Sequence, residues 1–248
     1  MERLILASSS PRRRELLSLL GVPFTVVATS VDEGPGAIRS PAETASLSLA
    51  KARAAAKFHR GGLIVAADTV VVYRGEIMGK PADPAEAASM LQHLRGRKHR
   101  VFSGLAVLDP RSQEGITQLV ETIVWMRNYS DDEIARYIAS GEPMDKAGAY
   151  AIQDRDFHPV ERVKGCYASV MGLPLCHLYL ALRQMGFALN ETSPRKVLKG
   201  CMKVGRMQYS ASKRGEVSFL EAPDRACQAF IGHECPAADV ILSHSVLK

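Results

Sequence analysis

The first fourteen residues predict a strand, a tight turn and a helix in immediate succession, which restricts the fold more than any other stretch of this chain of 248 residues. Leu4–Ala7 is a short apolar run typical of a buried strand, and three serines, Ser8–Ser10, follow it. Ser10 is a favoured N-cap residue, and Pro11 suits the first helical position, where the N–H that proline lacks is not needed. We therefore expect a helix to begin at Pro11.

Two arginines, Arg12 and Arg13, fall in the first turn of this expected helix. Positive side chains are unfavourable at a helix N-terminus, because the helix dipole and the free N–H groups attract negative charge there. Their position is explained if an anion such as phosphate binds among them. The segment therefore predicts an anion site at the end of a strand.

Strand-like and helix-like patterns alternate over the rest of the first 189 residues. We expect further strands over residues 24–28, 63–72, 100–108, 118–127 and 148–153. We expect helices over residues 40–58, 84–94, 130–141 and 173–185, the first three opening with capping sequences at Ser40, Asp83 and Ser130. A mixture of strands and crossover helices predicts an α/β fold.

The chain changes character after about residue 189, becoming polar and basic with weak periodicity. We interpret residues 1–189 as one domain and residues 190–248 as an appendage of unknown role. Cys201, Cys227, His233 and Cys235 lie in the appendage, but their spacing is not that of a standard zinc finger. Small buried side chains are the favoured interpretation of these cysteines.

Charge and hydropathy exclude several classes of protein. The net charge of +6 is a mild bias towards anionic partners and too weak to predict nucleic-acid binding. No apolar run approaches the roughly 18 residues of a membrane helix, and the start lacks a signal-peptide pattern. We therefore expect a cytoplasmic protein without a membrane partner. Five cysteines without a C-x-x-C pair do not predict a disulfide framework.

Asp68 is the strongest single candidate for a functional residue, because it is the one charge in the apolar run Leu63–Val72. A buried carboxylate is costly unless it binds a metal, a partner charge or a substrate. The alternative interpretation is an acid at the end of a strand that caps the next turn. The run continues past Asp68 to Val72, which favours the functional interpretation.

Other candidates depend on what the fold brings together. Glu33 follows another acid after the second strand and is ordinary surface unless it lies near Asp68. Lys51 lies within a helix, where most lysines are exposed, and Lys80 is held between a glycine and a proline. The amide of Gln153 offers a donor and an acceptor that suit the imide edge of uracil or thymine, although pairing with backbone is the alternative.

Taken in order, these segments resemble the Maf family of nucleoside triphosphate pyrophosphatases over about residues 3–186. The matching pieces are Leu6–Arg13, Asp32-Glu33, Ala50-Lys51-Ala52, Ala67–Val71, Gly79-Lys80-Pro81, Phe102-Ser103-Gly104, Asp145–Tyr150 and Gly172–Leu175. Each piece is a weak signal alone, but their number and order make a chance match improbable.

The resemblance implies an elongated α/β fold similar to inosine triphosphatase, with a mixed sheet, flanking helices and a central nucleotide cleft. It also implies a homodimer and a divalent metal, Mg²⁺ or Mn²⁺. The implied reaction converts a nucleoside triphosphate and water into the monophosphate and pyrophosphate. The pattern D-K-A-G-A-Y-x-I-Q, residues 145–153, is similar to that of the branch acting on dTTP and UTP.

The same resemblance assigns catalytic roles. Asp68 would be the general base, and Glu33, Lys51 and Lys80 would complete the catalytic pocket. Asp68 and Glu33 would hold the metal, because Mg²⁺ and Mn²⁺ prefer carboxylate oxygen. Whether Asp68 acts as base, metal ligand or both is open at this point.

Substrate-binding roles are assigned in the same way. Arg12, Thr69 and Gln153 would set substrate choice. Arg13 would offset phosphate charge, and Ser8 and Ser10 would supply hydroxyl and N–H donors. Arg14 is expected on a solvated face.

The chain departs from the family pattern beside Gln153. Ala151 and Asp154 stand where the family usually has glycine, and Lys164 and Cys166 replace an acid and a serine. These changes bear on the choice of base rather than on the reaction class.

Two alternatives remain open. The chain could be a non-catalytic nucleotide-binding regulator of cell division, because the family has a historical link to septum formation. It could also run the same reaction on a purine such as 7-methyl-GTP or ITP.

Overall fold

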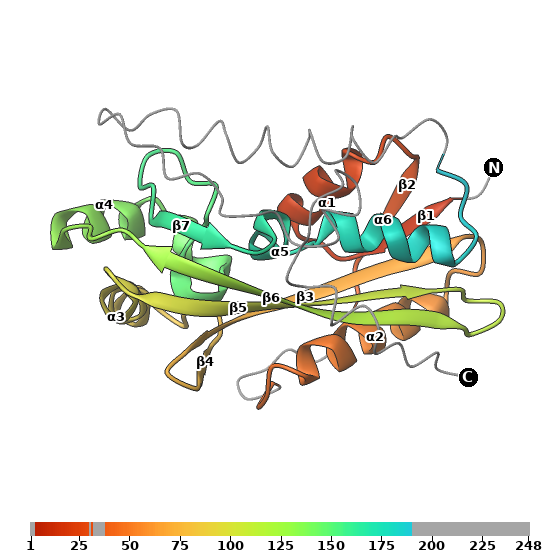
Figure 1. Cartoon of the computed structure of the whole chain (residues 1–248), viewed down its shortest axis with the longest axis horizontal. Helices are drawn as coiled ribbons and strands as arrows, with labels where there is room; N and C mark the ends of the chain where they lie inside the picture. Colours follow the sequence, from red (N-terminus) through yellow and green to blue (C-terminus); the bar gives the residue numbers. More distant parts are fainter. Residues whose placement is uncertain (1–2, 30, 32–37, 190–248) are drawn as a thin grey trace.

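The computed structural model describes residues 3–29, 31 and 38–189, and strands and helices alternate along them (Figure 1). The strands are β1 (Leu4–Ala7), β2 (Phe24–Val27), β3 (Leu63–Tyr73), β4 (Glu76–Met78), β5 (Lys98–Leu108), β6 (Gly115–Met126) and β7 (Val160–Lys164). The helices are α1 (Pro11–Ser18), α2 (Glu43–Ala56), α3 (Pro84–Leu94), α4 (Asp131–Ala139), α5 (Tyr167–Met171) and α6 (Leu175–Gln184). Two 3₁₀ turns, η1 (Glu142–Asp145) and η2 (Ala147–Ala149), follow α4.

The strands form one mixed sheet in the order β2-β1-β3-β5-β6-β7, with β4 paired to β3. The pairs β1–β2 and β1–β3 are parallel, whereas β5 and β6 pair antiparallel with their neighbours. Helix α2 covers one face of the sheet, and α1, α5 and α6 lie on the other (Figure 1). Helices α3 and α4 pack together at one end. The predicted α/β class, a mixed sheet flanked by helices, is confirmed.

Helix α2 lies unusually close to the sheet because the side chains between them are small. Ala52, Ala55 and Ala56 of the helix pack on Ala66 of β3 and Ala106 of β5. A Cβ atom at Gly104 of β5 would lie only 2.3 Å from the carbonyl oxygen of Thr44 in α2. This close approach lets side chains of α2 reach β3 directly.

Strand β3 changes partners along its length, and the change creates an opening in the sheet. Its first residues, Leu63–Val65, pair with β1, and its last, Val71–Tyr73, pair with β4 on the same side. Between them, no described strand pairs with Ala66–Val70 on that side. Asp68 and Thr69 lie in this interval. Side chains alternate between the two faces of a strand, so these neighbours point to opposite faces beside the same gap.

Helix α1 begins at Pro11 as predicted, and of the three predicted capping sequences two are confirmed and one is wrong. Ser130 and Glu133 form the predicted capping box of α4, and Asp83 caps α3 by accepting from the N–H of Glu86. The predicted box at Ser40 is wrong, because α2 begins at Glu43. The Glu43 carboxylate accepts instead from the N–H of Arg39, and residues 40–45 form bonds that span three residues.

The predicted strand over residues 148–153 is also wrong. Gly148 and Ala149 have positive φ angles of 68° and 59°, so the backbone turns there in η2 instead of extending. The left-handed region suits glycine, and here it also includes an alanine that is fully buried. Strand β7 and the short helix α5 were not predicted.

Several sequence predictions fall outside the described residues. These are the acid Glu33 and the whole of residues 190–248, including Cys201, Cys227, His233 and Cys235. The proposed division at residue 189 therefore stays a prediction. Within the residues that are described, no helix has the length and apolar character required to cross a bilayer.

The contact at Gly104 can be tested by substitution. Gly104→Ala should lower the free energy of unfolding by about 1–3 kcal/mol, because the added methyl group meets the backbone of α2. Urea denaturation of the purified protein measures the change. Gly61→Ala is the matched control, since no described atom lies within 4 Å of a Cβ built there. Equal stability of the two variants would contradict the close packing of α2.

Candidate active site

A cavity of about 920 Å³ lies beside the open interval of β3. The sequence candidates within the described residues all line it, namely Ser8, Ser10, Arg12, Arg13, Lys51, Asp68, Thr69, Lys80 and Gln153. They come from the turn after β1, from α1, α2 and β3, from the loop after β4 and from the segment after η2. The fold therefore brings together residues that are up to 145 positions apart, from Ser8 to Gln153.

A buried ion pair lies on one wall of this cavity. The Nζ atom of Lys51 donates to Oδ1 of Asp68 at 2.5 Å, and their side chains are 4% and 12% exposed. Lys51 belongs to α2 and Asp68 to β3, so the pair joins the helix to the sheet. This contact explains how a carboxylate is accommodated within the apolar strand β3, and it leaves the second oxygen, Oδ2, as the atom of Asp68 available to the cavity.

Arg13 is held in place by the turn after β1 and by the end of α5. Its Nη1 donates to Ser8 Oγ at 3.1 Å, and its Nε donates to the carbonyl of Gly172 at 2.9 Å. Ser8 Oγ also accepts from the N–H of Ser10 at 3.2 Å. Arg14, in contrast, is exposed and is not part of the cavity wall, as the sequence predicted.

Ser10 occupies the N-cap position of α1, but it does not act as the predicted side-chain cap. Among the described residues its hydroxyl makes no capping hydrogen bond, and its own N–H is turned towards Ser8. The free backbone N–H groups at the start of α1 therefore receive no hydrogen bond from the side chain of Ser10. An anion in the cavity could serve that purpose.

Arg12 is positioned by an acid that the sequence analysis had not selected. Its Nη1 lies 3.5 Å from Oδ2 of Asp145, whose Oδ1 accepts from Lys146 at 2.6 Å. Burial opposes ionisation of Asp145, but the bond from Lys146 and the nearby charge of Arg12 outweigh it and lower its pKa. Asp145 is the first residue of the D-K-A-G-A-Y motif. The sequence did not reveal its role, because its partner Arg12 lies in a distant segment of the chain.

Gln153 presents an unpaired acceptor. Its Oε1 atom is buried and has no hydrogen-bond partner within the described part of the chain, although the residue lines the cavity. A buried polar atom without a partner is costly in a folded protein. The arrangement is consistent with a ligand that donates a hydrogen bond at this point.

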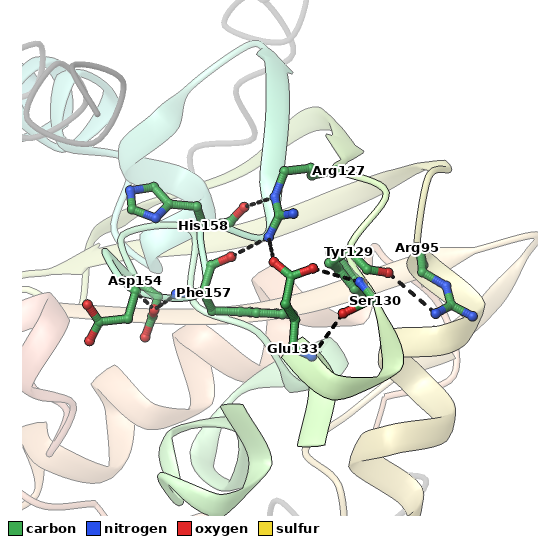
Figure 2. Close-up of polar contacts among 9 residues, drawn as sticks. Arg95, Arg127, Tyr129, Ser130, Glu133, Asp154, Phe157 and His158 are labelled. Atoms are coloured by element: carbon green, nitrogen blue, oxygen red, sulfur yellow. Dashed lines mark hydrogen bonds and ion pairs between the residues drawn. The ribbon is translucent and has the colours of Figure 1, made fainter. Parts of the chain in front are cut away.

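The segment that carries Gln153 is irregular and is held by side chains from neighbouring elements. At its near end, the hydroxyl of Tyr137 in α4 accepts from the N–H of Ala151 at 3.0 Å. At its far end, Arg127 donates to the carbonyls of Phe157 and His158 at 2.7 and 3.0 Å (Figure 2). The backbone around Gln153 is thus fixed from both sides.

Arg127 is itself oriented by Glu133, which accepts from its Nη2 at 2.8 Å (Figure 2). The other carboxylate oxygen of Glu133 accepts from the N–H of Ser130 and closes the capping box of α4. The bond from Arg127, followed by that from Ser130, lowers the pKa of Glu133. The helix cap and the position of the Gln153 segment are therefore coupled.

Asp154 replaces the usual glycine but stays outside the cavity wall. Its Oδ1 accepts from the N–H groups of Phe157 and Asp156 at 2.7 and 3.1 Å, which closes a tight turn (Figure 2). This carboxylate organises the segment after Gln153 locally.

Lys80 follows β4 in a loop that is joined to the same segment. The carbonyl of Gly79 accepts from the N–H of Gly148 at 2.9 Å. A Cβ atom at Gly148 would also meet the side chain of Val71 at 3.0 Å, so this close approach requires glycine. Lys80 and Gln153 therefore sit on backbone segments that are tied together.

Thr69 contacts Ser103, a residue that was quoted as part of a motif but not selected as a candidate. The two face each other in the β3–β5 register, and their hydroxyl oxygens are 2.8 Å apart. Ser103 is fully buried. Its signal in the sequence is a single hydroxyl residue within Val101–Leu108, the apolar part of β5.

A buried histidine supports the cavity wall without joining the candidates. Burial lowers the pKa of His99 to about 3, so the ring is neutral, and its Nε2 lies 2.8 Å from the hydroxyl of Tyr150. Tyr150 lines the cavity. This pair stiffens the wall between β5 and the segment after η2.

The described side chains are compatible with a divalent metal that is bound mainly by substrate and water. They contain no cluster of three or more acidic, histidine or cysteine side chains around one point. Asp68 can offer Oδ2, and Mg²⁺ is commonly held by one or two carboxylates together with phosphate oxygens and water. The second predicted ligand, Glu33, lies outside the described residues.

Comparison with known sequences identifies the family. The family described as "Maf-like protein" matches residues 3–185. The chain belongs to the Maf family. This Maf protein is 46% identical over 190 residues to a dTTP/UTP pyrophosphatase of Dictyoglomus thermophilum, covering 76% of this chain and 98% of the relative.

Other relatives carry the same name. A dTTP/UTP pyrophosphatase of Geotalea uraniireducens is 48% identical over 184 residues, covering 74% of this Maf protein and 95% of the relative. That of Moorella thermoacetica is 49% identical over 177 residues, covering 71% and 91%. A solved nucleoside-triphosphatase, named dITP/XTP pyrophosphatase, from Mycobacterium abscessus is 20% identical, with a TM-score of 0.35, and the match covers 51% of this chain and 75% of that one.

The buried pair can be tested through stability. Lys51→Met should lower the free energy of unfolding of this Maf protein by about 3 kcal/mol, because it leaves Asp68 without its buried partner charge. The double variant Lys51→Met/Asp68→Asn should regain most of that loss, since it removes both charges. Urea denaturation measures all three proteins. A double variant as unstable as Lys51→Met would show that packing, rather than charge, dominates at this position.

The Arg127 contact predicts a pH dependence. Because the folded-state pKa of Glu133 is lowered, its contribution to stability is complete above the unfolded pKa of about 4.5 and is lost as pH falls through the folded value. The stability difference between wild type and Arg127→Met should therefore be constant from pH 7 to about 5 and shrink at lower pH.

Arg95→Met is the matched control for that measurement. Arg95 donates to the carbonyl of Tyr129 (Figure 2). It also pairs with Asp131 in the first turn of α4, but no described contact links it to residues 157–158. Its loss should destabilise the protein less than the loss of Arg127. A difference for Arg127→Met that does not change with pH would contradict the role given to Glu133.

Proposed function

We propose that this Maf protein hydrolyses dTTP and UTP between the α- and β-phosphates and releases the monophosphate and pyrophosphate. The observation that supports this most strongly is the convergence on one cavity of a carboxylate, several cations and an unpaired amide acceptor. The names of relatives at 46–49% identity point to the same reaction.

The cations suit a triphosphate. Arg13, Lys51 and Lys80 line the cavity from three different elements, and the uncapped start of α1 adds an oriented backbone dipole. Hydrolysis of a phosphoanhydride depends on offsetting the charge of the phosphates and on placing one water in line with the leaving group. A bound Mg²⁺ or Mn²⁺ would supply further positive charge to the phosphates.

Asp68 is the residue to which we assign the proton transfer. Its Oδ1 is held by Lys51, so the carboxylate has one orientation and directs Oδ2 to the reacting water. Acceptance of a proton by a positioned carboxylate is ordinary general-base catalysis. Lys51 then has two functions, since it orients the base and contributes charge beside the phosphates.

Gln153 and Thr69 are assigned to the nucleobase. The buried Oε1 of Gln153 lacks a donor, and the N3–H group of uracil or thymine would supply one. The N–H of Ala151 donates to Tyr137 and is therefore not available to a base. Its methyl group, at a position that is usually glycine, would narrow the space for the base.

The homodimer and the cytoplasmic location stay predictions. We also propose that nucleic acid is not a partner and that residues 190–248 form an appendage. Both proposals concern partners or residues that the structure does not describe. The nucleotide substrate is the part of the partner assignment that the cavity supports.

A substrate panel tests the proposed function. Wild type with Mg²⁺ or Mn²⁺ should release pyrophosphate from UTP and dTTP faster than from CTP, GTP, ITP or 7-methyl-GTP. Asp68→Asn should lower kcat by at least ~100-fold, which is the usual contribution of a general base. Glu86→Gln should retain the wild-type kcat, because this cavity-lining acid caps the start of α3 by accepting from the N–H of Ala82.

The panel also distinguishes the alternatives. Hydrolysis confined to the purine nucleotides would keep the reaction and overturn the choice of base. Tight binding of UTP without turnover would favour a regulator, as would an Asp68→Asn protein that keeps the cellular effect of the wild type. An Asp68→Asn protein that keeps the wild-type kcat would instead overturn the role of Asp68 as general base. No pyrophosphate from any nucleotide with either metal would refute the enzyme assignment.

A further inference from the structure

We propose that Ser103 fixes the hydroxyl of Thr69 as a hydrogen-bond acceptor towards the cavity and thereby selects uracil and thymine against cytosine. This proposal rests on the proposed function, because it concerns how the same cavity recognises the base. Ser103 is a positioning residue in this scheme, since it acts through Thr69 and does not line the cavity itself.

The direction of the hydrogen bonds follows from the number of hydrogens available. Ser103 Oγ lies 2.6 Å from the carbonyl oxygen of Ser169, and a carbonyl oxygen can only accept. The single hydroxyl hydrogen of Ser103 is therefore used in that bond. The contact of 2.8 Å between Ser103 and Thr69 must then be donated by Thr69.

The surroundings hold this direction in place. Ser103 is fully buried in β5, so its hydroxyl cannot turn to solvent, and the β3–β5 register keeps it opposite Thr69. The Ser169 carbonyl belongs to the short helix α5 and also accepts from the N–H of Gly172 at 3.0 Å. The series of hydrogen bonds from Thr69 through Ser103 thus ends on a carbonyl oxygen, which can only accept.

Thr69 lines the cavity with its one hydrogen already donated to Ser103. Its oxygen can therefore only accept a hydrogen bond from a ligand. Gln153 is different, because its amide can rotate and present either a donor or an acceptor. Thr69 is therefore the residue that presents only an acceptor to the ligand, whereas Gln153 can present either group.

An acceptor at this position distinguishes the pyrimidines. Uracil and thymine have a donor at N3, and Thr69 Oγ1 and Gln153 Oε1 would share its hydrogen in a three-centre bond, whereas N3 of cytosine is an acceptor. Two acceptors placed against each other leave both groups unpaired in a buried site, which is how a hydrogen-bonding pocket rejects a close analogue. Guanine also carries a ring N–H, so Ser103 should not determine the preference over purines.

The test is the ratio of kcat/KM for UTP to that for CTP, two substrates with the same ribose and triphosphate. Wild type should prefer UTP. Ser103→Ala frees the hydrogen of Thr69 to be donated to cytosine N3, so the ratio should fall by about tenfold, the effect of one ordinary hydrogen bond. The ratio of UTP to GTP should change much less.

Ser169→Ala is the matched control. This buried hydroxyl belongs to the same polar cluster and bonds Thr122 and the carbonyl of Cys166, but it does not contact Thr69. The backbone carbonyl that receives Ser103 is retained in the variant. The UTP-to-CTP ratio should therefore stay at the wild-type value, although the stability of the protein falls.

The Thr69→Val background isolates the effect further. Thr69→Val should lower the ratio on its own, and adding Ser103→Ala should then change it no more, because the hydroxyl that Ser103 orients is gone. If Ser103→Ala does not fold in a thermal melt, Thr69→Val decides the matter by itself: a fallen ratio supports the proposal, and an unchanged one overturns it.

Other outcomes are equally decisive. Equal use of UTP and CTP by wild type, an unchanged ratio in folded Ser103→Ala, or an equal fall in Ser169→Ala would overturn the proposal while leaving the reaction intact. Failure of wild type to hydrolyse UTP and dTTP would instead refute the proposed function, so the two failures are distinguishable.

Discussion

The ion pair between Lys51 and Asp68 is the interaction on which the arrangement of the site depends. It requires α2 to lie almost against the sheet, and the small side chains beneath the helix together with Gly104 make that possible. A larger residue at Gly104 would push the helix away and with it the lysine. The same packing that builds one face of the core therefore orients the carboxylate that we assign to catalysis.

The second constraint is the incomplete pairing of β3. Its partner on one side changes from β1 to β4, and the interval between them contains Asp68 and Thr69. Because neighbouring residues of a strand point to opposite faces, Asp68 meets α2 while Thr69 meets Ser103 and the end of α5. One short interval thus supplies both the proposed base and a proposed specificity residue.

The local patterns predicted much of this fold. The strand, turn and helix at the start, the strand around Asp68 and the capping box at Ser130 were all recognisable, because each depends on residues close together in the chain. The strand predicted over residues 148–153 failed because positive φ angles at Gly148 and Ala149 turn the backbone. That segment is held instead by Arg127 and Tyr137, and no local pattern reveals such distant partners.

The sequence by itself determined most of the elements, the family and the candidate residues, since apolar spacing, caps and ordered motifs are written along the chain. It could not determine which atoms those residues use. The burial of Lys51, the pairing of Arg12 with Asp145 and the direction of the bond from Thr69 depend on contacts between distant segments. Only the tertiary structure decides these, because hydrogen bonds and charge pairs require atoms within about 3–4 Å of each other.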